Sequence, residues 1–441
     1  MKRLVLLMAL VACSGPAGLN GNPVSRTSAL RLGSGSRTPI QHVVIIVQEN
    51  RSVDNLFQFL PGAHTRSWGY NSKGEKVNLQ AVSLVEGFDF NHQHQDFLTE
   101  YADGAMDGWN LDLCTGQCRH ATPFAYVPQS QVQPYYTMAE QYAFADDMFQ
   151  TNEGPTFPAH QYLISGTSTI SRGSEYVVDN NPGNVSQTRD GGCNSPPSSA
   201  VESININTGV AGPSIYPCFE RKTLMDLITA GSPSFSWRYF QQLGGAGLRH
   251  GPDAIESIVQ NPHYRMYVKW PASKILTTIQ SGQLPTVAWV TPSSADSDHP
   301  EANKGTGPAW VASIVNAIGK SQYWDNTTIF IMWDDWGGWF DHVKPIRYNA
   351  NELGFRVPLI VISAYTPKGY ISTKQHEFGS ILKYTEENFG LGSLGTTDER
   401  SDNLSDCFNY KMTPRRFVPI ASSENASYFI HLKPDTTPLR D

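Results

Sequence analysis

A strand that ends in two carboxylates constrains this chain more than any other feature. Residues 329–333 form a short apolar run, and Asp334 and Asp335 follow it directly. This pattern is typical of a buried parallel strand that delivers side chains to a site at its carboxyl end. Gly337 and Gly338 then predict a tight turn close to whatever binds there. Adjacent carboxylates repel each other, so the pair indicates a metal ion; solvated acids at a strand end are the alternative.

A second strand ends in the same way. Residues 42–48 are mostly branched and apolar, and Glu49 and Asn50 follow them. In an open α/β sheet, ligands gather outside the carboxyl ends of the strands, which share one edge. We therefore expect these two residues to converge with Asp334 and Asp335 and to hold a metal ion. Taken alone, the pair after residues 42–48 is equally well explained as a helix-capping turn.

Further strands and helices alternate along the chain. The expected strands are residues 235–240, 284–292 and 356–363, and the expected helices are residues 134–149, 219–228, 308–318 and 380–389. This alternation predicts an α/β fold, a three-layer α/β/α sandwich with a mostly parallel central sheet that is covered on both faces.

Three more residues are candidates for the site. A Gly-Pro turn at residues 154–155 places Thr156 at the expected start of a helix, where the helix dipole would stabilise its alkoxide. A simple capping role for that hydroxyl is the alternative. His299 lies just beyond the strand at 284–292, and we expect it at the same sheet edge. His92 lies in a segment without periodicity, which predicts a loop.

The N-terminus predicts export. Residues 1–12 have a basic start and an apolar core, which is typical of a secretory signal. Residues 10–13 resemble a bacterial lipobox, so Cys13 is expected to carry lipid, with an ordinary signal peptide as the alternative. Residues 13–39 predict a flexible tether before a catalytic domain at 40–441. We expect a periplasmic or cell-surface lipoprotein that contacts the membrane through Cys13, or alternatively a secreted protein.

Composition agrees with an exported enzyme. The net charge is −7 and no basic block occurs, which argues against nucleic acid as a partner. In an oxidising compartment Cys114 with Cys118, and Cys193 with Cys218, could form disulfides, while Cys407 is expected to be free and buried. Residues 179–217 are rich in Asn, Gly, Ser and Pro and predict an insertion or lid.

Seven groups of residues, in order, resemble the bacterial phosphoesterase family, which includes non-haemolytic and haemolytic phospholipases C and an acid phosphatase. The groups are residues 48–52, 91–92, 106–108, 154–156, 297–300, 333–343 and 356–358. The resemblance spans residues 41–408 and implies a core similar to the alkaline phosphatase superfamily. It also implies hydrolysis of a phosphate ester or phospholipid through a phospho-threonine intermediate, with one divalent metal ion of unknown identity.

The resemblance also implies roles for single residues. By motif position, Thr156 is the nucleophile; Glu49, Asn50, Asp334 and Asp335 hold the metal together with the Thr156 oxygen; and His92 and His299 contact the phosphoryl group or protonate the leaving group. His160 and Asp298 are also expected to bind substrate. Asp341 and His342 match the family and are expected to be structural. Trp109, Phe157, Trp336 and Trp339 are candidates for a choline site or for core packing.

Two departures from the family pattern leave alternatives open. His160 stands where the family often has Arg, and it cannot replace that residue bidentately. Asp335 stands where the family usually has Glu, which shortens one ligand by a methylene and leaves the metal's identity open.

Phospholipase C or acid phosphatase activity is the expected function. The alternatives are a non-catalytic surface lipoprotein that binds a ligand, and a sulfatase or phosphonate hydrolase of the same superfamily.

Overall fold

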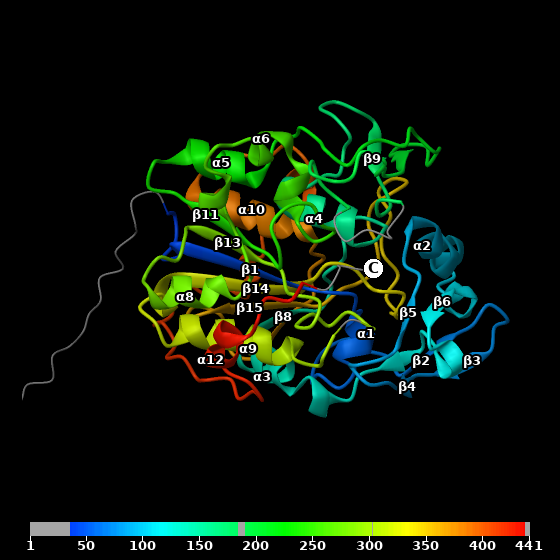
Figure 1. Cartoon of the computed structure of the whole chain (residues 1–441). Helices are drawn as coiled ribbons and strands as arrows, with labels where there is room; N and C mark the ends of the chain where they lie inside the picture. Colours follow the sequence, from blue (N-terminus) through cyan, green and yellow to red (C-terminus); the bar gives the residue numbers. More distant parts are fainter. Residues whose placement is uncertain (1–35, 184–189, 302, 437–441) are drawn as a thin grey trace, which may run out of the picture. The chain divides into compact units, whose positions relative to one another are not determined.

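The computed structural model describes residues 36–183, 190–301 and 303–436. The expected signal peptide, Cys13 and most of the tether lie outside these residues. An eight-stranded sheet forms the centre of the described chain (Figure 1). Its strands are, in spatial order, β12 (Val268–Lys269), β11 (Trp237–Phe240), β13 (Val287–Val290), β1 (His42–Gln48), β14 (Thr327–Trp333), β15 (Leu359–Ser363), β8 (Ala143–Ala145) and β16 (Tyr370–Ser372).

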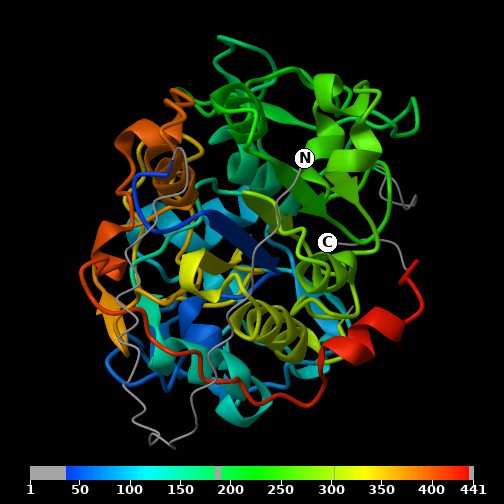
Figure 2. The same cartoon turned by 90° about the vertical axis from the view of Figure 1, so that its left-hand side faces the viewer.

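Helices cover both faces of this sheet, as Figures 1 and 2 show. On one face lie α4 (Thr156–Ser165), α5 (Leu224–Gly231) and α10 (Phe378–Phe389), and on the other lie α3 (Gln133–Gln141), α8 (Lys274–Gln280), α9 (Gly307–Gly319) and α12 (Ala426–His431). The shorter helices are α1 (Val53–Leu56), α2 (His94–Tyr101), α6 (Glu256–Val259), α7 (Tyr264–Tyr267) and α11 (Thr397–Arg400). The predicted three-layer α/β/α sandwich is confirmed.

Strand direction places the site. β15 runs antiparallel to both of its neighbours, and the other pairs in the sheet are parallel. The carboxyl ends of β1, β13, β14 and β11 therefore share one edge. In the register of β1 with β14, Gln48 pairs with Trp333, so the polar residues after each strand emerge side by side. Every residue of β14 is buried, as its apolar run predicts.

Small two-stranded sheets surround the central one. They pair β2 (Trp68–Tyr70) with β3 (Lys76–Asn78), β4 (Gln80–Ala81) with β7 (Ala125–Tyr126), β5 (Phe88–Phe90) with β6 (Cys114–Gly116), and β9 (Tyr176–Val178) with β10 (Ser203–Asn205). The last pair lies within or beside the predicted insertion at 179–217, whose role as a lid stays a prediction.

One predicted helix is too long. Residues 134–149 were expected to be helical, with residues 146–150 running on into a strand-like piece, but α3 ends at Gln141. Tyr142 leaves helical geometry, with φ −128° and ψ −144°. Residues 143–145 instead form β8, which pairs with β15 and β16 inside the sheet. Strand pairing in the folded core overrides the local helical pattern here, which periodicity alone does not reveal.

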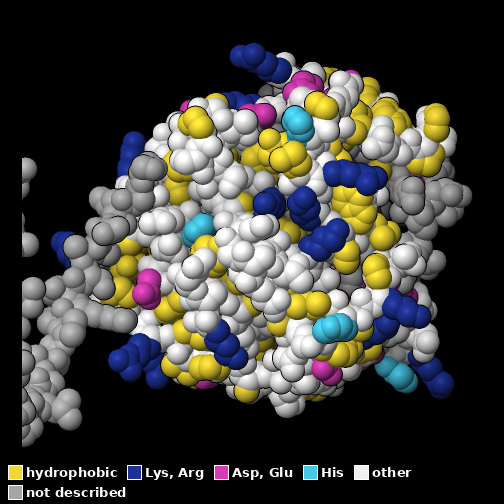
Figure 3. All heavy atoms as spheres, turned by 60° about the vertical axis from the view of Figure 1, so that its left-hand side comes forward, with side chains coloured by type: hydrophobic (Ala, Val, Ile, Leu, Met, Phe, Trp, Pro, Cys, Tyr) yellow, Lys and Arg dark blue, Asp and Glu magenta, His cyan; other side chains and the backbone are white. Residues whose placement is uncertain are grey.

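The cysteine predictions are confirmed. Cys114 is bonded to Cys118, Cys193 is bonded to Cys218, and Cys407 is free and buried. On the face drawn in Figure 3, Lys and Arg side chains, with a small group of them near the centre, are interspersed with hydrophobic side chains. Among the described residues, no helix has the length and apolar character needed to cross a bilayer.

Candidate active site

The tips of β1 and β14 hold each other in place beyond the strands. The Asp334 N–H donates to the Gln48 carbonyl at 3.0 Å, and the Arg51 N–H donates to the Asp335 carbonyl at 3.0 Å. Asn50 adopts a left-handed conformation with φ +57°. The turn after β14 approaches this segment closely: a Cβ at Gly337 would lie 2.6 Å from the Asn50 carbonyl oxygen.

Backbone N–H groups orient the two Asp side chains. The N–H groups of Asn50 and Asp335 donate to Asp334 Oδ1 at 3.2 and 2.9 Å, and the Gly337 N–H donates to Asp335 Oδ1 at 2.9 Å. The other carboxylate oxygen of each Asp points toward the candidate site residues. Asp334 Oδ2 lies 3.5 Å from His160 Nε2, and Asp335 Oδ2 lies 3.2 Å from the Thr156 hydroxyl. The predicted convergence of these strand tips with Thr156 is therefore present.

Thr156 begins helix α4, as the Gly-Pro turn predicts, and its side chain is buried. Its hydroxyl donates to Asp335 Oδ2 at 3.2 Å. The positive end of the α4 dipole favours negative charge at this oxygen. The turn before it is closely packed, because a Cβ at Gly154 would lie 2.3 Å from the Asp179 carbonyl oxygen.

Glu49 is fully buried beside the guanidinium group of Arg249. Arg249 Nε lies 2.8 Å from Glu49 Oε2, and His160 Nε2 lies 3.8 Å from Oε1. Burial raises the pKa of Glu49, and the nearby Asp334 carboxylate raises it further, while Arg249 and His160 act in the opposite direction. Oε1 has no hydrogen-bond partner among the described residues. This oxygen is therefore available to a cation.

His160 lies in α4, one turn after Thr156 and on the same face of the helix. Its Nδ1 lies 3.2 Å from the Tyr239 hydroxyl, and its Nε2 faces Glu49 and Asp334. Burial alone would lower the pKa of His160, but these two carboxylates outweigh it and raise the pKa to about 8. The imidazole thus belongs to the carboxylate cluster.

His92 and His299 lie on the other side of the cluster, with ring centroids 6.4 Å apart. His92 Nε2 lies 2.9 Å from Asn50 Nδ2 and 3.9 Å from Asp335 Oδ2. His299 Nε2 lies 3.7 Å from Asp89 Oδ2. In both rings Nδ1 faces a backbone carbonyl oxygen, at 2.7 Å for His92 and 2.5 Å for His299. Because a carbonyl only accepts, Nδ1 carries a proton in each.

Asp298 lies one residue before His299 but is engaged elsewhere. Its Oδ2 accepts hydrogen bonds from the Tyr135 hydroxyl at 2.9 Å and from Trp333 Nε1 at 3.0 Å. Burial raises the pKa of Asp298 to about 6. Its N–H donates to Gln48 Oε1 at 3.0 Å. These contacts anchor the loop that carries His299, and the expected role of Asp298 in binding substrate stays a prediction.

A small cavity of about 60 Å³ reaches His92 from outside. It is lined by Asp89, Phe90, Asn91, His92, Gln93, Thr115, Pro155 and Asn181. Thr115 lies inside the disulfide loop at 114–118, and Asn181 comes from the predicted insertion. The Asn181 side chain also accepts a hydrogen bond from the Phe157 N–H at 2.8 Å, next to Thr156. Pro155, the residue before Thr156, is part of the cavity wall.

The aromatic residues near the motifs are packed rather than exposed. Trp109 and Trp336 belong to one buried cluster, Trp339 to another and Phe157 to a third. All four are fully buried. Their packing favours the core interpretation over a preformed choline site.

Arg249 is the site residue that sequence reasoning missed. It follows the carboxyl end of β11 in a Gly-rich loop, as the other site residues follow β1, β13 and β14. It is buried, and neither Nη1 nor Nη2 has a hydrogen-bond partner among the described residues. The sequence predicts the strand at 235–240. The Arg249–His250 pair, which follows that strand after a Gly-rich loop, was therefore the feature that could have indicated a site residue here.

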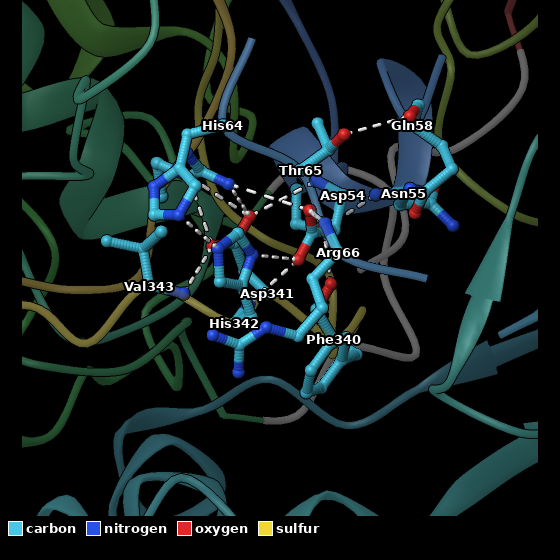
Figure 4. Close-up of polar contacts among 12 residues, drawn as sticks. Asp54, Asn55, Gln58, His64, Thr65, Arg66, Phe340, Asp341, His342 and Val343 are labelled. Carbon is cyan, nitrogen blue, oxygen red and sulfur yellow. Dashed lines mark hydrogen bonds and ion pairs between the residues drawn. The ribbon is translucent and has the colours of Figure 1, made fainter. Parts of the chain in front are cut away.

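A second cluster of acids and histidines secures the loop after β14 (Figure 4). Asp54 Oδ2 lies 2.6 Å from His342 Nδ1, and His342 Nε2 lies 3.2 Å from His64 Nε2. Arg356 Nε donates to Asp341 Oδ1 at 3.1 Å. Arg356 precedes β15, the reversed strand, and therefore arrives at the same sheet edge. These ion pairs fit the structural role expected for Asp341 and His342.

Three phospholipases C illustrate the similarity to known proteins. Non-hemolytic phospholipase C of Pseudomonas aeruginosa is 23% identical over 85% of this chain and 58% of its own length. Phospholipase C A of Mycobacterium tuberculosis is 22% identical over 87% and 80%, and non-specific phospholipase C6 of Arabidopsis thaliana is 22% identical over 88% and 76%. The chain thus spans less than two-thirds of the Pseudomonas relative.

Similarity to solved structures is weaker. A protein in the alkaline phosphatase superfamily from Vibrio parahaemolyticus matches with a TM-score of 0.37 and 10% identity, over 82% of this chain and 70% of its own. That score is too low to support an argument. The model of the Phosphoesterase family matches residues 40–392, which is well over half of the chain. The chain therefore belongs to the Phosphoesterase family.

Proposed function

We propose that this protein hydrolyses phosphoric esters with Thr156 as the nucleophile. The observation that carries the proposal is the position of the Thr156 hydroxyl, at the N-terminus of α4 and 3.2 Å from Asp335 Oδ2. A helix N-terminus favours both an alkoxide and a phosphoryl group. Phosphoryl transfer depends mainly on alignment and neutralisation of charge.

Glu49, Asn50, Asp334 and Asp335 would hold a divalent ion. All four are buried, and Glu49 Oε1 has no hydrogen-bond partner among the described residues. Three buried carboxylates beside one Arg leave an excess of negative charge, which is costly without a cation. Carboxylate and amide oxygens suit a divalent ion. When bound, the ion would neutralise phosphoryl charge and favour the ionised hydroxyl.

The reaction would proceed in two displacements. The Thr156 hydroxyl first loses its proton to solvent. The alkoxide oxygen Oγ1 then forms a bond to phosphorus while the bond from phosphorus to the alcohol oxygen breaks, and the alcohol leaves with a proton from an imidazolium. Water then attacks the phospho-threonine, gives its proton to the same imidazole, and releases the phosphate product with the Thr156 oxygen restored. Such general acid catalysis contributes about 10²–10⁴-fold.

His299 suits the proton donor, and His92 suits a positioning role. With Nδ1 of His299 donating to the Pro300 carbonyl, Nε2 carries a proton only in the imidazolium, which Asp89 at 3.7 Å favours. In neutral His92, Nδ1 donates to a carbonyl and Nε2 accepts from the Asn50 amide. This contact holds the side-chain nitrogen of Asn50 toward His92, so the side-chain oxygen of Asn50 points away from the imidazole ring.

Two substrate types are supported by different observations. Similarity to phospholipases C favours a phospholipid. The cavity of about 60 Å³ and the packed aromatic side chains instead favour a small phosphomonoester. Rates on phosphatidylcholine, p-nitrophenyl phosphate and p-nitrophenyl sulfate distinguish them. Turnover of the sulfate ester alone would identify the protein as a sulfatase and not a phosphoesterase. If metal-loaded protein turned over none of the three esters, a non-catalytic binding protein would be favoured.

Replacement of Thr156 tests the nucleophile. We expect Thr156→Ala to lower kcat at least about 10³-fold while metal content and thermal unfolding stay unchanged, because only the attacking oxygen is lost. Thr156→Ser is the matched control, since it keeps a hydroxyl, and we expect it to retain measurable turnover and to become labelled by ³²P-substrate after acid quench. A Thr156→Ala protein with wild-type rates would exclude this nucleophile.

A further inference from the structure

His160 occupies the position where the family often carries Arg, one helical turn after the nucleophile candidate. A guanidinium cannot bind a cation, whereas a neutral imidazole can. We propose that His160 Nε2 is a ligand of the divalent ion, together with carboxylate oxygens of Glu49 and Asp334. The inference rests on the metal site of the proposed function and adds a nitrogen donor to it.

Hydrogen bonding fixes the tautomer of His160. The Tyr239 hydroxyl donates its single proton to the Arg249 carbonyl oxygen at 2.9 Å. Its oxygen is then an acceptor for the His160 Nδ1–H, which lies 3.2 Å away. In the neutral ring the lone pair is therefore on Nε2. A metal-binding His usually donates its other ring N–H in this way, which orients the ligand and makes it more basic.

The surroundings of Nε2 lack a donor for that lone pair. Nε2 has no hydrogen-bond partner among the described residues, and it faces Asp334 Oδ2 at 3.5 Å and Glu49 Oε1 at 3.8 Å. A neutral Nε2 that faces two carboxylates in a buried site needs either a proton or a metal ion between them, and a bound metal ion would take the place of the proton. Metal bonds of about 2.0–2.2 Å with tetrahedral angles place ligand atoms roughly 3.3–3.6 Å apart. The observed separations are close to this spacing.

Arg249 complements this arrangement from outside. It contacts Glu49 Oε2 at 2.8 Å and leaves Oε1 on the side of His160. Ligand atoms of Glu49, His160 and Asp334 all lie within 4.8 Å of one another. The positive charge that the family places on α4 is thus supplied here by a different segment, and α4 contributes an imidazole instead.

A nitrogen ligand changes which metals the site prefers. Imidazole suits Zn²⁺ and other late first-row ions, whereas sites made of carboxylate and carbonyl oxygens suit Mg²⁺, Ca²⁺ and Mn²⁺. We therefore expect Zn²⁺ to bind more tightly than Mg²⁺, and removal of the imidazole to reduce that preference.

Metal binding to the full chain, without substrate, tests the proposal. Protein stripped of metal is titrated with ZnSO₄ and with MgCl₂ by calorimetry, and the zinc-loaded protein is examined by X-ray absorption. For His160→Asn we expect Zn²⁺ affinity to fall by at least about 10-fold, with Mg²⁺ affinity changed less than about 3-fold, and one imidazole fewer in the zinc scattering. His42→Asn is the control, since that histidine lies at the opposite end of β1 from Glu49.

The outcomes separate this proposal from the proposed function. Equal Zn²⁺ affinity and equal imidazole scattering in wild type and His160→Asn would overturn the ligand assignment and leave an all-oxygen metal site standing. Failure of wild-type protein to bind either ion would overturn the metal site itself. If His160→Asn does not fold, as judged by circular dichroism, wild-type zinc scattering from oxygen alone would still refute the proposal.

Discussion

At the scale of the residue, Arg249 balances the charge of the site and presents unused donors. Its Nε contacts Glu49, while Nη1 and Nη2 have no hydrogen-bond partner among the described residues. Buried guanidinium groups are normally fully hydrogen-bonded, and a planar pair of N–H groups matches two phosphoryl oxygens. We infer that these donors contact the phosphoryl group of the substrate.

Replacement of Arg249 tests this contact. For Arg249→Lys, which keeps the charge and removes the paired donors, we expect inhibition by inorganic phosphate to weaken about 10–100-fold, because a hydrogen bond to a charged group contributes about 1.5–3 kcal/mol. Inhibition constants for phosphate and vanadate measure the effect. Arg221→Lys is a matched control, since Arg221 is also buried with unbonded guanidinium nitrogens but packs on Phe219. Unchanged phosphate inhibition in Arg249→Lys would contradict the inference.

At the scale of the element, the turn after β14 depends on glycine for two separate reasons. Gly337 has φ +60°, and a Cβ there would also lie 2.6 Å from the Asn50 carbonyl oxygen. The first reason concerns local strain, and the second concerns the distance between the two strand tips. Gly74 shares the first feature, with φ +73°, but a Cβ there would meet nothing within 4 Å.

This pair of glycines gives a matched test of the strand tips. We expect Gly74→Ala to lose about 1 kcal/mol of unfolding free energy from the left-handed backbone, and Gly337→Ala to lose more, because its Cβ also meets the Asn50 backbone. Only Gly337→Ala should also lose metal affinity and turnover, because it pushes Asn50 and Asp335 apart. Urea unfolding and metal titration measure the two effects. Normal metal binding and activity in Gly337→Ala would show that the spacing of the tips is not critical.

The elements also show what the sequence could and could not reveal. Asp334 and Glu49 were predictable because each follows an apolar run, and a parallel sheet brings such ends to one edge. Arg249 was missed because a Gly-rich loop separates it from its strand, so no apolar run ends at it. The direction of β15 and the short strand β8 depend on partners far along the chain, which local patterns do not encode. Thr156 was placed correctly because Gly-Pro turns act locally.

At the scale of the whole molecule, two disulfides should contribute unequally to stability. The bond between Cys193 and Cys218 spans 25 residues, and the bond between Cys114 and Cys118 spans 4. In the loop-entropy model, closing these loops raises the free energy of the unfolded chain by about 3.5 and about 2 kcal/mol respectively. The longer loop belongs to the segment that also carries Asn181, beside the cavity.

Paired Cys→Ser variants measure this difference. We expect the double variant at 193 and 218 to lose about 1–2 kcal/mol more unfolding free energy than the double variant at 114 and 118, since its loop is longer. Urea denaturation followed by tryptophan fluorescence gives both values, and wild-type protein treated with reductant is the control. A larger loss from the shorter loop would show that native contacts, rather than chain entropy, determine these contributions.

The narrow cavity beside His92 also bears on turnover. A volume of about 60 Å³ holds roughly two waters, far less than a diacylglycerol leaving group. A lipid product that left through this cavity would have to wait until Thr115 and Asn181 move aside, so solvent viscosity would limit the rate of its release. A small alcohol would escape without that delay. Viscogens such as sucrose should therefore slow long-chain substrates selectively, and the size of the product would decide which step limits the cycle.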